Sequence, residues 1–178
     1  AYAVSGLKGK VIATKISDVK SEDTVADIPG VEYDVKELVA QKAEEEGFVY
    51  GDTTSVAISP DGTKLAAAIQ HADYDKAGVV AVFTCEEDGT LTDPKLYTAG
   101  VQPDMVTFAD NNILLTADEG EPRMGYGAGT TDPKGTVSII NIQENSSTQV
   151  GFEDFTVEEL IAENLSLIHI SEPTRLQL

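Results

Sequence analysis

The chain has 178 residues, 41% of them hydrophobic, and its 31 acidic residues against 12 basic ones give a net charge of −19. Such a charge disfavours binding to nucleic acid or to anionic lipid, and the hydrophobic fraction is that of a folded globular protein. No apolar run approaches the roughly 20 residues of a membrane-spanning helix, so we expect no membrane insertion within these residues. Cys85 is the only cysteine, which excludes an internal disulfide.

The N-terminal part of the chain contains short strand-like runs and one helix signal. Residues 2–5 and 10–16 have the composition of two strands joined by a glycine-containing turn. The segment 17–50 then interrupts the strand pattern, and we interpret it as an insertion. Within it, Asp34 is followed three residues later by Glu37, and Gly47 lies downstream, which predicts a capped helix near residues 35–46.

Two later stretches repeat one strand–turn–strand pattern. Residues 55–68 carry Ser-Pro-Asp-Gly between two apolar runs, and residues 105–117 carry Ala-Asp-Asn-Asn in the same place. The period is about 50 residues, which is typical of the blades of a β-propeller. Each copy continues into two more strand-like runs, so residues 51–99 and 100–155 are each predicted to form one blade.

The repeat predicts the architecture of the whole chain. Residues 1–16 match the later strands of a blade, so they are expected to be the end of a truncated one. The chain then holds about two and a half blades, whereas a propeller needs at least about four to close. We therefore predict an all-β fragment of a β-propeller with a helical insertion. The strand positions that match in the repeat are expected to be buried, namely Ile58, Leu65, Val82, Phe108, Leu114 and Ile139.

The C-terminal segment has two parts. Thr156 and Glu159 have the spacing of a capping box, which predicts the start of a helix over residues 156–164. Residues 165–175 read Leu-Ser-Leu-Ile-His-Ile-Ser-Glu-Pro-Thr-Arg, and this run resembles the in-frame translation of a transposase-type sequencing adaptor. Residues 165–178 are therefore interpreted as a non-native tail.

The best candidate for a functional site is an acidic loop after the second strand of the later blade. Glu119 and Glu121 alternate in Asp-Glu-Gly-Glu-Pro-Arg, and carboxylates at alternate positions can converge on a hard cation such as Ca²⁺. Asp104 begins the preceding antiparallel strand, so it is expected at the same edge of the sheet. These three residues are the predicted calcium ligands. In the alternative, structural interpretation, the carboxylates of Glu119 and Glu121 accept hydrogen bonds from backbone N–H groups, and Arg123 holds them in place.

Several motifs resemble those of the choice-of-anchor I family, which includes the mesenchyme-specific cell-surface glycoproteins and many bacterial proteins labelled alkaline-phosphatase-like. The motifs are Pro103-Asp104-Met105, Glu119-Gly120-Glu121-Pro122 and Asp132-Pro133-Lys134-Gly135-Thr136-Val137. The chain departs from the family pattern at Asp118, where asparagine is expected. The resemblance covers roughly residues 50–155, extends weakly to residues 1–16, and implies an extracytoplasmic, surface-anchored β-propeller.

Two functions follow from these observations. In the first, the chain is part of a cell-surface or secreted binding or structural module whose extracellular ligand is unknown. In the alternative, it is part of a calcium-dependent, phosphatase-like phosphoesterase that uses the acidic loop. Phosphate-ester hydrolysis usually requires two metals, or a nucleophile with positive charge around the leaving oxygens, and this sequence supplies scattered acids and Arg123. The first function is therefore favoured, and no catalytic residues are assigned.

Overall fold

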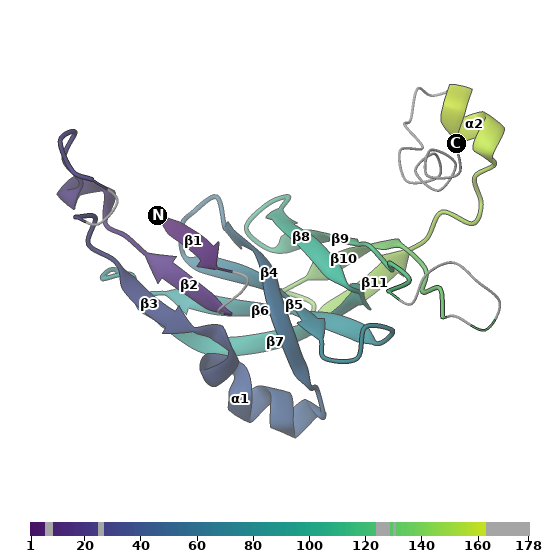
Figure 1. The fold of residues 1–178 in the computed structure, drawn as a ribbon, viewed down its shortest axis with the longest axis horizontal. Helices are drawn as coiled ribbons and strands as arrows, with labels where there is room; N and C mark the ends of the chain where they lie inside the picture. Colours follow the sequence, from purple (N-terminus) through teal and green to yellow (C-terminus); the bar gives the residue numbers. More distant parts are fainter. Residues whose placement is uncertain (6–8, 25–26, 124–128, 130, 163–178) are drawn as a thin grey trace.

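The computed structural model consists mainly of three antiparallel β-sheets that follow one another along the chain (Figure 1). It describes residues 1–5, 9–24, 27–123, 129 and 131–162. The first sheet has the order β1 (Tyr2–Ser5), β2 (Lys10–Ala13) and β3 (Val31–Asp34). The second has the order β4 (Tyr50–Ile58), β5 (Lys64–His71), β6 (Ala77–Cys85) and β7 (Leu91–Val101). The third contains β8 (Pro103–Phe108), β9 (Ile113–Asp118), β10 (Thr136–Asn141) and β11 (Ser146–Val150), again in consecutive order.

The turns predicted from the repeat connect these strands. Gly62 ends the turn between β4 and β5 with φ 72°, and Gly89 lies in the hairpin between β6 and β7 with φ 88°. Positive φ is readily accessible to glycine, so the two Asp-Gly pairs set both hairpins. The Glu86 N–H donates to the Thr90 carbonyl at 2.9 Å, which closes the second hairpin. This segment is therefore a β-turn.

Helix α1 (Val35–Glu46) forms where the capping signals predict it. The Asp34 carboxylate accepts a hydrogen bond from the Glu37 N–H at 3.1 Å. Gly47 ends the helix in the left-handed conformation, with φ 69°. The helix buries Val35 and Val39 against the first two sheets, so it closes one side of their shared core. A short 3₁₀ helix, η2 (Ile16–Asp18), precedes it.

Strand β3 was not expected, because it lies inside the segment interpreted as an insertion. It pairs with β2 along its whole length, with Val11 opposite Tyr33. Tyr33 packs against the first core, whereas Glu32 is exposed. The strand has only four residues, which is too short an alternation to stand out beside the helix signals.

Two hydrophobic cores lie between the sheets. The first core contains Val11 from the first sheet, Leu65 and Phe83 from the second, and the buried side of α1. The second core lies between the second and third sheets. The buried residues of the second core are Ala66, Ala68, Val80, Val82, Tyr97, Ala99, Val106, Leu114 and Ile140. The second and third sheets thus pack face to face.

The predicted buried positions are confirmed in part. Leu65, Val82 and Leu114 are buried, and Phe108 is half-buried against the second core. The predictions for Ile58 and Ile139 are wrong, since these side chains are 48% and 39% exposed. Ile58 is the last residue of β4 and lies at the sheet edge. Ile139 lies between the buried residues Ser138 and Ile140, so its side chain is on the opposite, uncovered face of the third sheet.

The C-terminal helix α2 (Val157–Ala162) begins with the predicted capping box. The Thr156 N–H donates to the Glu159 carboxylate at 2.8 Å, and the Glu159 N–H donates to the Thr156 hydroxyl at 3.2 Å. The proposed tail, residues 165–178, lies outside the described residues. Within the described residues, none of the helices has the length and apolar character needed to cross a membrane.

Candidate functional site

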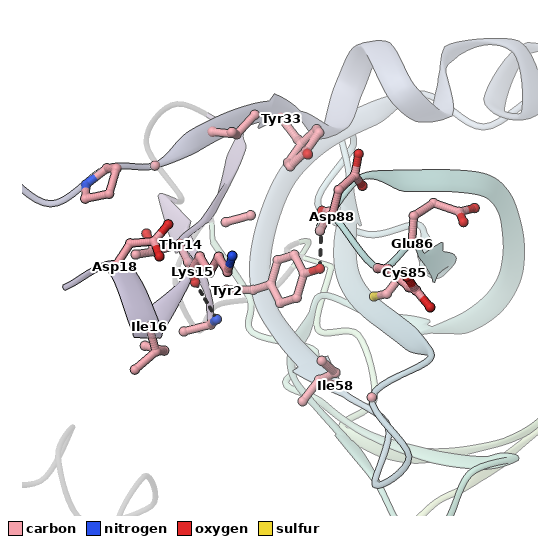
Figure 2. Close-up of a pocket in the computed structure, with 18 residues that line it drawn as sticks. Tyr2, Thr14, Lys15, Ile16, Asp18, Tyr33, Ile58, Cys85, Glu86 and Asp88 are labelled. Carbon is pink, nitrogen blue, oxygen red and sulfur yellow. Dashed lines mark hydrogen bonds between the residues drawn. The ribbon is translucent and has the colours of Figure 1, made fainter.

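A hollow of about 610 Å³ lies between the first two sheets (Figure 2). Its walls come from the start of β1, the end of β2, η2, the start of β3, the end of β4 with the turn after it, and the hairpin between β6 and β7. We call it the intersheet hollow. Because β3 forms part of its wall, its position depends on the strand that the sequence did not predict.

Tyr2 lies near the centre of the hollow, with its hydroxyl directed at the backbone of the β6–β7 hairpin (Figure 2). The hydroxyl donates to the Gly89 carbonyl at 3.2 Å. Burial, followed by a hydrogen bond with Cys85, raises the pKa of Tyr2 to about 12. The phenol therefore stays neutral at physiological pH, and it joins the first sheet to the hairpin of the second.

Three large aliphatic side chains line the hollow while remaining open to solvent. Ile16 is 64% exposed, Val31 is 56% exposed and Ile58 is 48% exposed. They come from three separate segments, namely η2, β3 and the end of β4. Aliphatic groups that gather at a concave surface favour contact with the apolar part of a ligand.

Acidic groups outnumber basic ones around the same hollow. The lining contains the carboxylates of Asp18, Glu86, Glu87 and Asp88, against Lys15 and the N-terminal ammonium group. Hydrogen bonds from the side chain and backbone of Thr90 lower the pKa of Asp88, so this carboxylate is ionised at neutral pH. The electrostatic field of the lining therefore favours a cationic group.

Cys85 is the thiol of the lining and is half-buried. Burial raises the pKa of this thiol, so it is protonated at neutral pH and is a poor nucleophile. Apolar side chains, a neutral phenol and a negative rim suit the binding of a ligand better than covalent chemistry.

The predicted calcium ligands lie at the opposite ends of the strands from the hollow. Pro103 pairs with Asp118, and the Glu119 N–H donates to the Gln102 carbonyl at 3.0 Å, so the segments of Asp104 and Glu119 are neighbours. The side chains of Asp104, Glu119 and Glu121 are all exposed. In the described part of the chain, no three His, Cys, Asp or Glu side chains are grouped so that they could hold a metal ion. The calcium site remains a prediction.

Asp118, which opens the acidic loop in the sequence, is buried and has a different role. Its carboxylate accepts hydrogen bonds from the hydroxyls of Thr116 at 2.7 Å, Thr136 at 2.8 Å and Ser138 at 2.6 Å. Ser138 in turn accepts the Gly100 N–H at 2.9 Å. Asp118 therefore links β9, β10 and the end of β7, whereas Glu119 and Glu121 of the same loop face solvent. The sequence signal that could have predicted this network is the spacing of two residues between Thr116 and Asp118 in one strand and between Thr136 and Ser138 in the next.

Gln102 was also missed by the sequence analysis. It is 1% exposed and has φ 56°, a backbone conformation that side-chain-bearing residues adopt rarely. Its side-chain amide donates to the carbonyls of Tyr74 at 2.9 Å and Glu121 at 2.7 Å. It thereby holds the β5–β6 loop of the second sheet to the acidic loop of the third. Arg123 donates to Gln70 at 2.9 Å, which adds a second link between these sheets.

The comparisons with known proteins agree with this architecture. A crystal structure from Bacteroides fragilis, provisionally named as a 6-phosphogluconolactonase, has a TM-score of 0.50 and 20% sequence identity. The match covers 84% of this chain and 34% of that one, so the chain spans about a third of the length of this structure. At this identity the likeness concerns the fold alone. No curated protein matches the sequence.

The family assignment rests on a sequence model. The model of the choice-of-anchor I domain matches residues 4–175, which is nearly the whole chain. The matched range extends into residues 165–178, whose non-native origin stays a prediction. The motifs around Pro103 and Glu119 had indicated the same family. The chain belongs to the choice-of-anchor I domain family.

Proposed function

We propose that the chain is part of a surface-anchored, extracellular β-propeller that acts as a ligand-binding module. Its family membership supports the surface location, and the face-to-face packing of consecutive antiparallel sheets supports the propeller. The much longer chain of the similar structure is consistent with further blades outside these residues.

The intersheet hollow carries the binding role in this proposal. It combines exposed aliphatic groups, such as Ile16 and Val31, with a rim on which carboxylates predominate. The ligand class that fits both features is a cationic one with an apolar part, such as a segment of peptide in which lysine alternates with leucine. The carboxylates would attract the ammonium groups, and the aliphatic side chains would cover the leucines.

A binding experiment with the 178-residue chain tests this role. We expect calorimetry to detect binding of a blocked Lys-Leu-Lys-Leu peptide, and to detect none of a Glu-Leu-Glu-Leu peptide. Glu87→Gln removes one rim carboxylate and should weaken binding about two- to five-fold, the usual effect of one exposed ion pair. Glu44→Gln, which removes an exposed carboxylate from α1, is the matched control and should leave the affinity unchanged.

Two results would contradict the proposed binding role. The first is no heat of binding with the cationic peptide at low salt. The second is equal loss of affinity in Glu87→Gln and Glu44→Gln, because it would show attraction by the net charge alone. The surface location is tested separately, by labelling the full-length protein on intact cells with an impermeant reagent.

The calcium-dependent phosphoesterase remains the alternative. It requires that Asp104, Glu119 and Glu121 bind Ca²⁺ together, so calcium should raise the melting temperature of the full-length protein by mass action. The Glu119→Gln variant should respond less. A melting temperature that is independent of calcium would remove this alternative.

A further inference from the structure

One face of the third sheet is apolar and uncovered in the described structure. Two complete cross-strand rows make up this face, because residues paired side by side in a sheet point the same way. We call these eight residues the open face: Met105, Ala117, Val137 and Val150 in one row, and Thr107, Leu115, Ile139 and Thr148 in the other.

The open face is unusual for this chain because it carries no charge. The whole chain is 24% charged residues, yet the eight positions hold aliphatic, methionine and threonine side chains only. Met105 is 59% exposed, Val150 is 46% exposed and Ile139 is 39% exposed. Side chains of this size are normally covered when they gather on one sheet face.

The register of the repeat identifies what these positions do in the preceding sheet. Leu65 pairs with Ile58 and Phe83 in the second sheet, and Leu114 pairs with Phe108 and Ile140 in the third. These two cross-strand rows are equivalent in the repeat. The neighbouring rows of the two sheets can therefore be aligned by counting residues along each strand from these rows. The residues of the second sheet that correspond to the open face are Ser55, Ala57, Ala66, Ala68, Val80, Val82, Lys95 and Tyr97.

In the second sheet this face is an interface. Ala66, Ala68 and Val80 are fully buried there, and Val82 and Tyr97 are 6% and 5% exposed. They are covered by the third sheet, through side chains that include Val106, Leu114 and Ile140. The open face therefore repeats, one sheet later, a surface that already binds a sheet.

We propose that the open face is the docking surface for a further four-stranded antiparallel sheet of the same repeat. That sheet would present apolar residues at the positions equivalent to Val106, Leu114 and Ile140. This inference rests on the proposed function, in which the chain is part of a larger propeller, and it assigns the surface through which the next blade is held.

A second copy of the chain fits the open face less well than such a sheet. In a copy, the face with Val106, Leu114 and Ile140 is already buried in the second core. The outer face of the first sheet is polar, since it carries Lys10 and Glu32 as an ion pair with 2.6 Å between Nζ and Oε2. Within the described residues, the apolar sheet face that a copy leaves free is therefore the open face itself, whereas the equivalent face of the second sheet packs against a face of the other kind, the one with Val106, Leu114 and Ile140.

Thiol labelling in the 178-residue chain and in the full-length protein tests the proposal. Both proteins carry Cys85→Ala, and any further cysteine of the full-length protein is also replaced by alanine, so that a single introduced cysteine reports on its position. We expect Ile139→Cys to react rapidly with a maleimide in the 178-residue chain, and at least about ten-fold more slowly in the full-length protein, because stable burial suppresses access. Gln143→Cys, in the exposed turn after β10, is the control and should react at the same rate in both.

Each outcome decides for or against the docking surface. Equal rates for Ile139→Cys in the two proteins would overturn it. Slow labelling in the 178-residue chain, with a dimer in light scattering, would show that a second copy is the occupant, and would also overturn it. If Ile139→Cys disturbs the circular dichroism spectrum, Val137→Cys in the same face replaces it. Protection in a full-length protein that is absent from the cell surface would support the docking surface while contradicting the proposed location.

Discussion

In this fold, single carboxylates that accept several hydrogen bonds from hydroxyl and backbone N–H groups stabilise turns. In the turn between β4 and β5, Oδ1 of Asp61 accepts from the Ser59 hydroxyl at 2.6 Å, the Thr63 N–H at 3.0 Å and the Thr63 hydroxyl at 2.8 Å. These hydrogen bonds, led by that of Ser59, lower the pKa of Asp61 from 3.8 to about 2. The folded chain thus prefers the ionised carboxylate more strongly than the unfolded chain does.

The pKa shift of Asp61 predicts how this turn responds to pH. Because the folded pKa is depressed, the contribution to stability is present above the unfolded pKa near 4 and is lost as the pH falls toward 2. We expect Asp61→Asn to be less stable than the wild type at pH 7, with the difference shrinking between pH 4 and pH 2. Urea unfolding of both proteins across this range measures it. A difference that does not change with pH would contradict the assignment.

Asp118 represents the buried version of the same arrangement. Its removal would leave the hydroxyls of Thr116, Thr136 and Ser138 without this acceptor, and those of Thr116 and Ser138 are buried. We expect Asp118→Ala to lower the free energy of unfolding by about 1–3 kcal/mol, the cost of leaving buried polar groups unpaired. Asp118→Asn should cost less, because the amide oxygen still accepts hydrogen bonds and a hydroxyl can rotate to accept from the amide nitrogen.

The matched control for Asp118 is Asp104→Ala, since Asp104 is exposed on the neighbouring strand. Chemical denaturation should show little change in this variant. If Asp104→Ala and Asp118→Ala are equally destabilised, the hydroxyl network is not the reason for the effect.

At the scale of elements, the sequence predicted strands correctly where turn residues and apolar runs lie close together along the chain. Strands β4, β5 and β6 were predicted because they are long apolar runs, and Asp-Gly pairs mark the turns between β4 and β5 and between β6 and β7. Strand β3 was missed because its four residues gain their stability from pairing with β2, a contact that local sequence does not encode. Ile58 and Ile139 were wrongly predicted to be buried because periodicity identifies a face but cannot show whether another element covers it.

Helix α1 offers a prediction at this scale. Its first turn relies on the hydrogen bond from the Glu37 N–H to Asp34, and its buried side completes the first core. We expect Asp34→Ala to lower the free energy of unfolding by about 0.5–2 kcal/mol, the range for loss of an N-cap. Lys36→Ala is the control. Lys36 lies two residues after Asp34 and is exposed, so this change should have little effect in urea unfolding. Equal destabilisation by both changes would contradict a capping role for Asp34.

At the scale of the whole molecule, the two candidate sites differ in how far the sequence could locate them. The edge that brings Asp104 close to the acidic loop follows from antiparallel pairing, which the repeat predicts. The intersheet hollow could not be found this way, because its walls come from η2, β3 and a hairpin about 70 residues away in sequence. Long-range packing created the hollow, whereas local patterning created the acidic edge.

The open face should control the solubility of the isolated chain. The net charge of the whole chain, −19, keeps copies of it apart at neutral pH. This repulsion disappears near the isoelectric point of 4.2. We therefore expect the 178-residue chain to become turbid near pH 4.2, and to bind a dye specific for apolar surface at pH 7. Ile139→Glu places a carboxylate in the middle of the open face and should reduce both signals. Gln143→Glu adds the same group in the turn after β10, outside the open face, and should leave dye binding unchanged. If both variants reduce dye binding equally, the effect comes from net charge, and the exposed apolar surface lies elsewhere on the molecule.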